Sequence, residues 1–177
     1  LPFSIKTRIV LKNKSTEDWA GFLLSFNISA LTIHGRTASQ MSKGKSDWEE
    51  IKKVVDIKNK LKKDTLIIGN GDVESYKEVL EKHEKFDVDG VMIGRGVFKN
   101  LLVFNKSEKK EELTNPEKQA ILKKHLELFK ETYDSKDYNS MKKYFKIYIN
   151  GFNGASELRN KLMITKNIEE AYSLLDD

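Results

Sequence analysis

Short β-branched runs alternate regularly with longer amphipathic stretches over residues 1–100. Candidate strands cover residues 3–9, 30–34, 65–69 and 90–93, and helical spacing of apolar residues predicts helices over 16–27, 48–60 and 74–85. Strand–helix–strand alternation favours right-handed βαβ units in a parallel sheet. We therefore predict an α/β fold in which these strands form half of a TIM (β/α)8 barrel, with a doubly wound sheet as the alternative.

The strand signal disappears beyond residue 104. Residues 105–114 form a charged connector, after which Asn115-Pro116 has the pattern of a helix start, with Asn as the cap and Pro in the first turn. Further helices are predicted over residues 117–133, 138–150, 155–163 and 167–175. The chain is thus expected to contain two domains, a half-barrel over 1–104 and a small all-α domain over 105–177.

Polar side chains stand at the carboxyl end of every predicted strand. Lys6 and Arg8 share one face of the first strand, His34 ends the second, and Asn70 and Arg95 follow the third and fourth. Because the carboxyl ends of parallel strands meet at one rim, we expect these groups to converge where barrel active sites are built. The layer beneath them, facing the barrel interior, is predicted to consist of Thr32, Leu66, Ile68, Val91 and Ile93.

The last two rim loops, Gly-Asn-Gly-Asp at 69–72 and Gly-Arg-Gly at 94–96, have the composition of an anion site. Glycines let backbone N–H groups approach an anion, a following helix N-terminus adds a favourable dipole, and Arg95 offers a charge-assisted contact to phosphate. Phosphate sites in barrels use the loops after strands 7 and 8, so these strands are predicted to be strands 5–8. Taken singly, each motif has a plainer interpretation as a turn, a solvated arginine or a structural histidine; their common position at strand ends favours a site.

Five motifs, in this order and spacing, resemble the tRNA-dihydrouridine synthase family. They are Ile-Lys-Thr-Arg at 5–8, Ile-His-Gly-Arg-Thr at 33–37, Asp-Trp at 47–48, Gly-Asn-Gly-Asp at 69–72 and Asp-Gly-Val-Met-Ile-Gly-Arg-Gly at 89–96. Residues 144–159 also resemble the family's helical tRNA-binding domain. The resemblance covers nearly the whole chain, and residues 105–137 carry least of it.

The resemblance implies an FMN-dependent oxidoreductase in which NADPH reduces the flavin and a hydride passes to C6 of a tRNA uridine. Carried over by motif, Lys6 and His34 contact the isoalloxazine ring, with Lys6 near N1/O2. The ribityl-phosphate end falls to Asn70, Gly71, Asp72, Gly94 and Arg95. Arg36 becomes a candidate contact to uridine or to a tRNA phosphate.

The family's proton donor is a cysteine of the N-terminal half, and this chain contains no cysteine. The resemblance therefore places no catalytic residue in this segment and puts the donor upstream of Leu1. On this interpretation the isolated chain is inactive, and it either pairs with the missing N-terminal half-barrel or self-associates through its unpaired strand edges.

The predicted helical domain is basic, with 11 Lys and Arg against 5 Asp and Glu over residues 118–166. The candidate tRNA-phosphate contacts, which would be sequence-independent and salt-sensitive, are Lys142, Lys143, Lys146, Arg159 and Lys161. Among the interleaved aromatics, Phe145, Ile149 and Phe152 have the spacing of a buried helix stripe.

Composition narrows the remaining classes. The absence of cysteine excludes disulfides and thiolate metal sites in this segment, and no metal site is predicted. No apolar run approaches the ~20 residues of a membrane helix, so we expect no membrane partner and a cytoplasmic location. Two other functions stay open: a different phosphate- or FMN-binding barrel oxidoreductase acting on a small molecule, and a non-catalytic RNA-binding fragment.

Overall fold

The protein is described by a computed structural model that covers residues 1–10, 14–106, 112–133 and 137–176. It divides into two compact units, Leu1–Ser107 and Glu108–Asp177. The predicted boundary at residues 104/105 lies close to this division.

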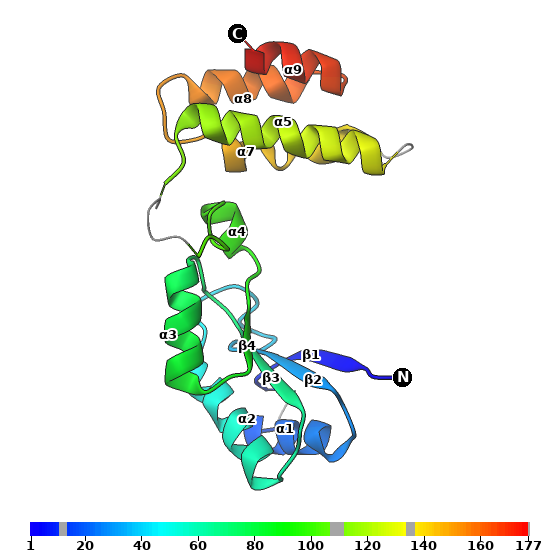
Figure 1. The fold of residues 1–177 in the computed structure, drawn as a ribbon, viewed down its shortest axis with the longest axis vertical. Coiled ribbons are helices and arrows are strands. Elements are labelled where there is room, and N and C mark those ends of the chain that lie inside the picture. The colour runs from blue at the N-terminus through cyan, green and yellow to red at the C-terminus, as the bar shows by residue number, and fades with distance from the viewer. Residues whose placement is uncertain (11–13, 107–111, 134–136, 177) are drawn as a thin grey trace. The chain divides into compact units, whose positions relative to one another are not determined.

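The first unit is built on a four-stranded parallel sheet in the order β1-β2-β3-β4 (Figure 1). Its elements are β1 (Ser4–Arg8), α1 (Thr16–Ser25), β2 (Ala30–His34), α2 (Trp48–Lys60), β3 (Leu66–Asn70), α3 (Tyr76–Phe86), β4 (Gly90–Met92) and α4 (Gly96–Lys99). The predicted α/β class and parallel sheet are confirmed. A doubly wound sheet would reverse its strand order at a switch point, and this sheet does not.

Side-chain caps fix where the three long helices begin. Ser15, Asp47 and Ser75 each accept hydrogen bonds from backbone N–H groups of the first turn of α1, α2 and α3. Because Ser75 is the cap, α3 begins at Tyr76 and not at residue 74 as predicted. At the other end of α1, Phe26 is extended, so that helix stops at Ser25, two residues before the predicted end.

The hydrophobic core of this unit lies between one face of the sheet and the three helices, with α2 packed between α1 and α3. Leu31, Ile33 and Ile67 from the central strands are at most 1% exposed. Val91 and Ile93 also pack against this core. Their predicted place in the opposite layer was wrong, because the β3–β4 register puts Gly90 and Met92 on the face of Ile68 and Asn70.

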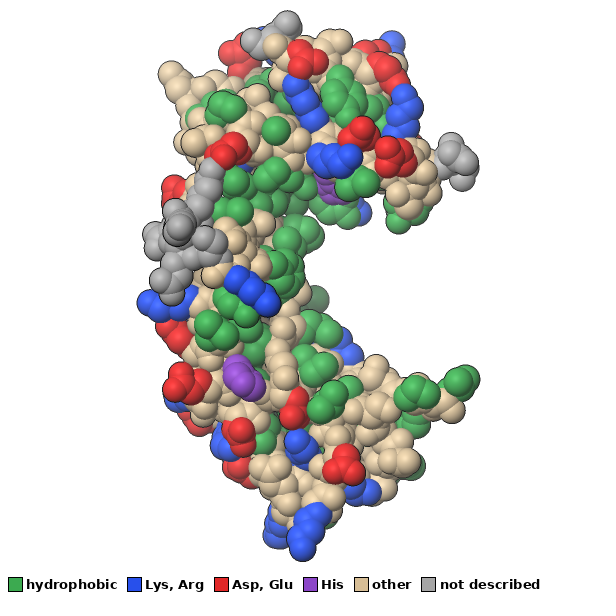
Figure 2. Space-filling view, in the orientation of Figure 1, with side chains coloured by type: hydrophobic (Ala, Val, Ile, Leu, Met, Phe, Trp, Pro, Cys, Tyr) green, Lys and Arg blue, Asp and Glu red, His purple; other side chains and the backbone are tan. Residues whose placement is uncertain are grey.

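No helix formed by the described residues of the first unit covers the other face of the sheet (Figure 1). Lys6, Thr32 and Ile68 are neighbours across it, and Leu66 on the same face is 50% exposed. β1 and β4 are the outer strands of the sheet. Figure 2 shows hydrophobic side chains at the surface where the chain enters β1.

An aromatic ladder runs along α1. Trp19 stacks on Phe22 at a centroid distance of 5.8 Å, and Phe22 meets Phe26 edge to face at 5.2 Å. The Trp19 indole donates to the Thr7 hydroxyl of β1, whereas Phe22 and Phe26 are about half exposed. The ladder therefore leaves apolar surface open beside an outer strand.

The second unit is helical over the residues described. Its elements are α5 (Asn115–Thr132), α6 (Asn139–Lys142), α7 (Phe145–Tyr148), α8 (Ala155–Ile164) and α9 (Ile168–Asp176). Thr114, not the predicted Asn115, occupies the N-cap of α5, where its backbone N–H and hydroxyl both donate to Glu117. The single helix predicted over residues 138–150 is instead two short ones, α6 and α7.

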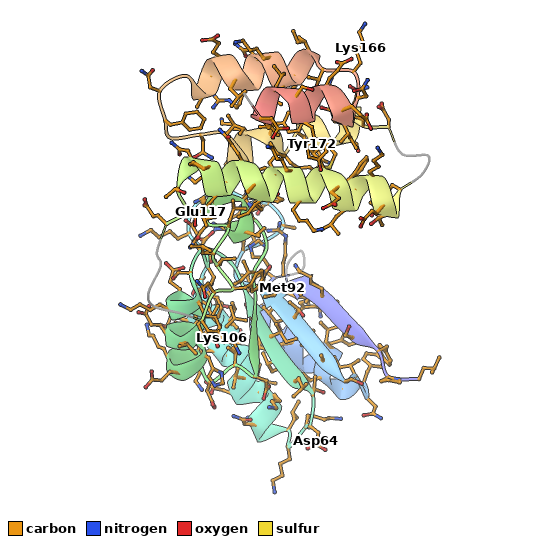
Figure 3. The ribbon with its side chains drawn as sticks, turned by 45° about the horizontal axis from the view of Figure 1, so that its top comes forward. Asp64, Met92, Lys106, Glu117, Lys166 and Tyr172 are labelled. Atoms are coloured by element: carbon orange, nitrogen blue, oxygen red, sulfur yellow. The ribbon has the colours of Figure 1, made fainter. Side chains whose placement is uncertain are left out.

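α5 packs against α7 and α9, and α8 packs against α7 and α9. Leu122, Leu126 and Leu162 are fully buried between them. The Tyr172 hydroxyl, labelled in Figure 3, donates to the Lys123 carbonyl and so ties α9 to α5. Phe145 and Ile149 are buried as predicted, whereas Phe152, the third residue of the predicted stripe, is only partly buried; Ile149 and Phe152 both lie beyond the end of α7.

Candidate functional site

A cavity of about 1060 Å³ opens at the carboxyl ends of the strands. Met92 marks this end of the sheet in Figure 3, and Asp64, just before β3, marks the opposite end. All of the residues carried over to the cofactor lie in the lining: Lys6, His34, Asn70, Gly71, Asp72, Gly94 and Arg95. Side chains that are far apart in the sequence thus share one cavity.

Strand register brings them together. Parallel pairing sets Arg8 beside His34, His34 beside Asn70, and Asn70 beside Met92. The Asn70 side-chain amide donates to the Met92 carbonyl at 2.7 Å, which fixes that side chain against the next strand. Lys6 lies one step below this row, level with Thr32 and Ile68.

The cavity carries an excess of positive charge. Its ionisable lining, besides His34, consists of Lys6, Arg36, Lys45, Lys82, Arg95 and Lys99 against Asp72 and Glu74. The side chains of Lys6 and Arg95 make no hydrogen bond or ion pair with any described residue, so their charges are available to a ligand. Such a cavity favours an anion.

Close backbone packing shapes the two glycine-rich loops. Gly71 has φ +135°, and a Cβ there would meet Ser46 Cβ at 2.6 Å; a Cβ on Gly96 would lie 2.0 Å from the Val73 carbonyl oxygen. Gly94, in contrast, has nothing within 4 Å of its Cβ position, so its backbone borders open space. The helix that follows the second loop, α4 (Gly96–Lys99), has only four residues, so the dipole expected to favour an anion there is small.

His34 is neutral in this setting. Burial, and then the positive charges of Arg8, Arg36 and Lys6, lower the pKa of its imidazole from 6.5 to about 4, while Asp72 acts in the opposite direction. Arg36 Nη1 lies 3.2 Å from His34 Nε2. A guanidinium has hydrogen-bond donors only, so Arg36 is the donor and Nε2 is the acceptor. The ring is therefore an acceptor at Nε2 and carries its proton on Nδ1.

Arg36 lies inside the protein. The residue is 3% exposed, and its Nη2 donates to both carboxylate oxygens of Asp72 at 2.7 and 2.6 Å. Its Nε and Nη2 also donate to the Gly44 carbonyl, at 3.2 and 2.6 Å. Every nitrogen of the guanidinium is thus occupied, which does not favour the substrate contact predicted for Arg36.

Asp72 is engaged in the same way. Besides Arg36, its carboxylate accepts from the Ser46 backbone N–H at 2.7 Å. Although burial acts to raise it, these hydrogen bonds hold the pKa of Asp72 below its ordinary value. Asp72 lines the cavity, but its carboxylate serves the protein's own loop.

Sequence reasoning missed the segment of residues 37–46 that forms one wall. Ser42, Gly44, Lys45 and Ser46 line the cavity, and Arg8 Nη1 donates to the Thr37 and Met41 carbonyls at 2.8 and 3.0 Å. The alternation that placed Arg8 on the face of Lys6 was the one available signal. Its partners are backbone carbonyls more than 25 residues away, which no side-chain pattern reveals.

The candidate tRNA contacts of the second unit fall into two groups. Lys142 and Lys143 lie over the rings of Tyr138 and Tyr144, at 5.6 and 4.9 Å from the centroids, and Lys146 is exposed. Arg159 instead donates to the Ile149 carbonyl at 2.7 Å, and Lys161 pairs with Glu157 at 2.9 Å. Only the first group is free of such partners among the described residues.

The described part of the chain contains no group of three or more His, Cys, Asp or Glu placed to hold a metal ion. None of its helices combines the length and apolar character needed to cross a membrane.

Comparison with known proteins gives a consistent answer. A family model described as "Dihydrouridine synthase (Dus)" matches residues 1–177. The chain is 39% identical over 180 residues to "Probable tRNA-dihydrouridine synthase 2" of Bacillus subtilis (strain 168), covering 100% of the chain and 55% of that protein. It is 40% identical over 180 residues to "Probable tRNA-dihydrouridine synthase" of Staphylococcus aureus (strain N315), covering 100% and 54%. The chain spans about half the length of these relatives.

Proposed function

This chain belongs to the dihydrouridine synthase family, and we propose that it is the C-terminal portion of a flavin-dependent tRNA-dihydrouridine synthase. In this proposal β1–β4 are strands 5–8 of a (β/α)8 barrel, and residues 105–177 are a tRNA-binding domain. Two observations on the described residues support the barrel: their helices cover one face of the sheet and leave the other open, and the strands follow in chain order. Action on tRNA makes the cytoplasm the expected location.

The observation that carries the proposal is the cavity itself, where consecutive parallel strands deliver Lys6, His34, Asn70 and Arg95 to one rim. FMN combines a phosphate with a flat heteroaromatic ring, and the lining offers matching partners for both. The unpaired guanidinium of Arg95 and the open backbone at Gly94 suit the phosphate. Asn70 and Gly71 line the same cavity, and we assign them to the ribityl-phosphate end as well.

When bound, reduced FMN supplies a hydride for C6 of the uracil ring, and NADPH restores the reduced flavin. Lys6 contributes a fixed positive charge that stabilises negative charge on the ring system. His34 contributes a neutral imidazole, since its lowered pKa keeps it uncharged near pH 7. We assign no proton donor to this chain, which contains no cysteine, and infer that the isolated chain does not turn over.

The structure leads us to revise two of the assigned roles. Arg36 and Asp72 bind each other and the 37–46 segment, so we assign them to the architecture of the site and not to substrate or phosphate. For tRNA we retain Lys142, Lys143 and Lys146 as the principal phosphate contacts. Arg159 and Lys161 stay as secondary candidates, because each already has a partner.

The test uses the full-length protein that contains this chain. FMN is titrated while flavin fluorescence is recorded, and unmodified tRNA is then incubated with the holoprotein and NADPH before its dihydrouridine content is measured. We expect stoichiometric FMN binding and dihydrouridine formation that requires NADPH. FMN binding with NADPH oxidation but unchanged tRNA would favour a small-molecule oxidoreductase. Binding of tRNA without flavin would favour a non-catalytic RNA-binding protein.

A further inference from the structure

We propose that Arg36 and Asp72 form a buried positioning pair that fixes the tautomer of His34, so that His34 presents Nδ1–H to a hydrogen-bond acceptor on the bound ligand. The same pair clamps the 37–46 segment as a wall of the cavity. The identity of the acceptor, a carbonyl oxygen or an imine nitrogen of a heteroaromatic ring, rests on the proposed function. The positioning itself does not.

The first step is the occupancy of the guanidinium. Nη2 of Arg36 is shared between the Asp72 carboxylate and the Gly44 carbonyl, Nε donates to Gly44, and Nη1 is directed at His34. With Asp72 and Gly44 holding the fork from two sides, Nη1 has little freedom to leave the imidazole. Arg36 has no acceptor, so Nε2 of His34 must be unprotonated.

The second step concerns the other ring nitrogen. Nδ1 of His34 has no hydrogen-bond partner among the described residues. Every buried side-chain nitrogen and oxygen of those residues does have a partner. Nδ1 is therefore accessible, and because His34 lines the cavity, its N–H is available to a ligand there.

Charge reinforces the geometry. The groups that act on the imidazole are Lys6 and Arg8 from β1, Arg36 from the chain just after β2, and Asp72 from the loop after β3. Three are cations and one is an anion, so a second proton on the ring is disfavoured. Asp72 bonds to Arg36 and thereby offsets part of that repulsion while keeping the guanidinium in place.

The third step links the pair to the wall. Asp72 accepts from the Ser46 N–H, Arg36 donates to the Gly44 carbonyl, and Arg8 donates to the Thr37 and Met41 carbonyls. The segment is thus held from three strand ends through its backbone. Removing the Asp72 charge would release both Ser46 and Arg36, which couples the wall to the imidazole.

The experiment reads the imidazoles directly in this chain. Long-range ¹H–¹⁵N spectra distinguish the two neutral tautomers, and only three histidines are present, so His34→Gln assigns the signal. Wild type is expected to show a neutral ring protonated at Nδ1 down to about pH 5. In Arg36→Gln and in Asp72→Asn we expect mixed tautomers. In Arg36→Gln we also expect an apparent pKa that moves from about 4 toward 6.5.

Arg95→Gln is the matched control, because it removes a cation from the same cavity without a contact to His34. Its tautomer should be that of wild type. An Nε2-protonated His34 in wild type would overturn the proposal, as would a wild-type pattern in both pair variants. If the pair variants do not fold, the wild-type tautomer still decides. FMN binding is measured separately, so absent flavin with the expected tautomer refutes the proposed function and leaves the positioning intact.

Discussion

Protonation of His34 should cost this protein stability in mild acid. The folded imidazole has a pKa of about 4, against 6.5 ordinarily. At pH values between these two the unfolded chain binds a proton that the folded chain does not, so stability falls as pH decreases. His34→Gln removes this titration while its amide oxygen can still accept from Arg36. The variant should therefore lose less stability than wild type between pH 7 and pH 5.

The magnitude follows from the two pKa values. The difference between 6.5 and about 4 sets a limit of roughly 3.4 kcal/mol, reached only below pH 4. At pH 5 the linkage expression gives roughly 2 kcal/mol of it. The ring is partly open to solvent, which screens its charge, so we expect about 1 kcal/mol of extra destabilisation in wild type.

Urea unfolding followed by tryptophan fluorescence measures this change. The two tryptophans, Trp19 and Trp48, both lie in the first unit, so the signal excludes His125 of the second unit, whose pKa is lowered by burial. Asp72 has a pKa below its ordinary value of 3.8, so its ionised carboxylate stabilises the fold fully above about that pH. The stability that Asp72 contributes is therefore lost only below the range from pH 7 to pH 5. Protein concentration is held constant. Equal losses in wild type and His34→Gln would show that the cationic surroundings do not shield the imidazole.

Three further predictions concern ligands and assembly. Arg95→Ala should weaken FMN binding to the full-length protein by about ten- to a hundredfold, the loss of roughly 1.5–3 kcal/mol expected for a charge-assisted contact; an unchanged Kd would make Arg95 a solvated loop residue. Replacing Lys142, Lys143 and Lys146 by Gln should weaken tRNA binding and reduce the slope of log affinity against log salt concentration by about 2 to 3. Lys161→Gln removes a lysine already paired with Glu157, so it should change the affinity and the slope far less. Equal effects of the two variants would refute the assignment. The isolated chain should oxidise no NADPH in the presence of unmodified tRNA. It should also self-associate through its outer strands and the half-exposed Phe22 and Phe26, which light scattering would detect as a mass above that of the monomer. An active monomer would contradict the half-barrel proposal.

Local patterns in the sequence predicted local structure well. β2 and α2 have the predicted bounds, because Ala30–His34 is a short β-branched run and Asp47 caps an unbroken amphipathic stretch. The cavity residues could be predicted because parallel strands place their carboxyl ends together whatever the details of packing. Polarity at strand ends was sufficient for that inference.

Tertiary structure decided what the sequence did not show. Which face of the sheet Val91 occupies depends on the register between β3 and β4. The alternation of residues along a strand as short as β4 does not fix that register. The pairing of Arg36 with Asp72 joins residues 36 positions apart, and each also had a reasonable ligand role when considered alone. Whether a charged side chain binds a ligand or an internal partner is shown by the three-dimensional structure and not by the sequence.

The strand order also has a consequence for how this protein is made. Within β1–β4 each strand pairs only with the strands just before and after it in the chain, so contacts among these four strands do not wait for a distant segment to be synthesised. A chain emerging from the ribosome can add one strand and one helix at a time to an existing edge, with short loop closures throughout. In a nascent chain paused between such additions, the hydrophobic layer of the strands already added is covered on the helix side. We therefore expect translation pauses within residues 1–106 to be tolerated, whereas closure of the proposed barrel must wait until β4 has been synthesised.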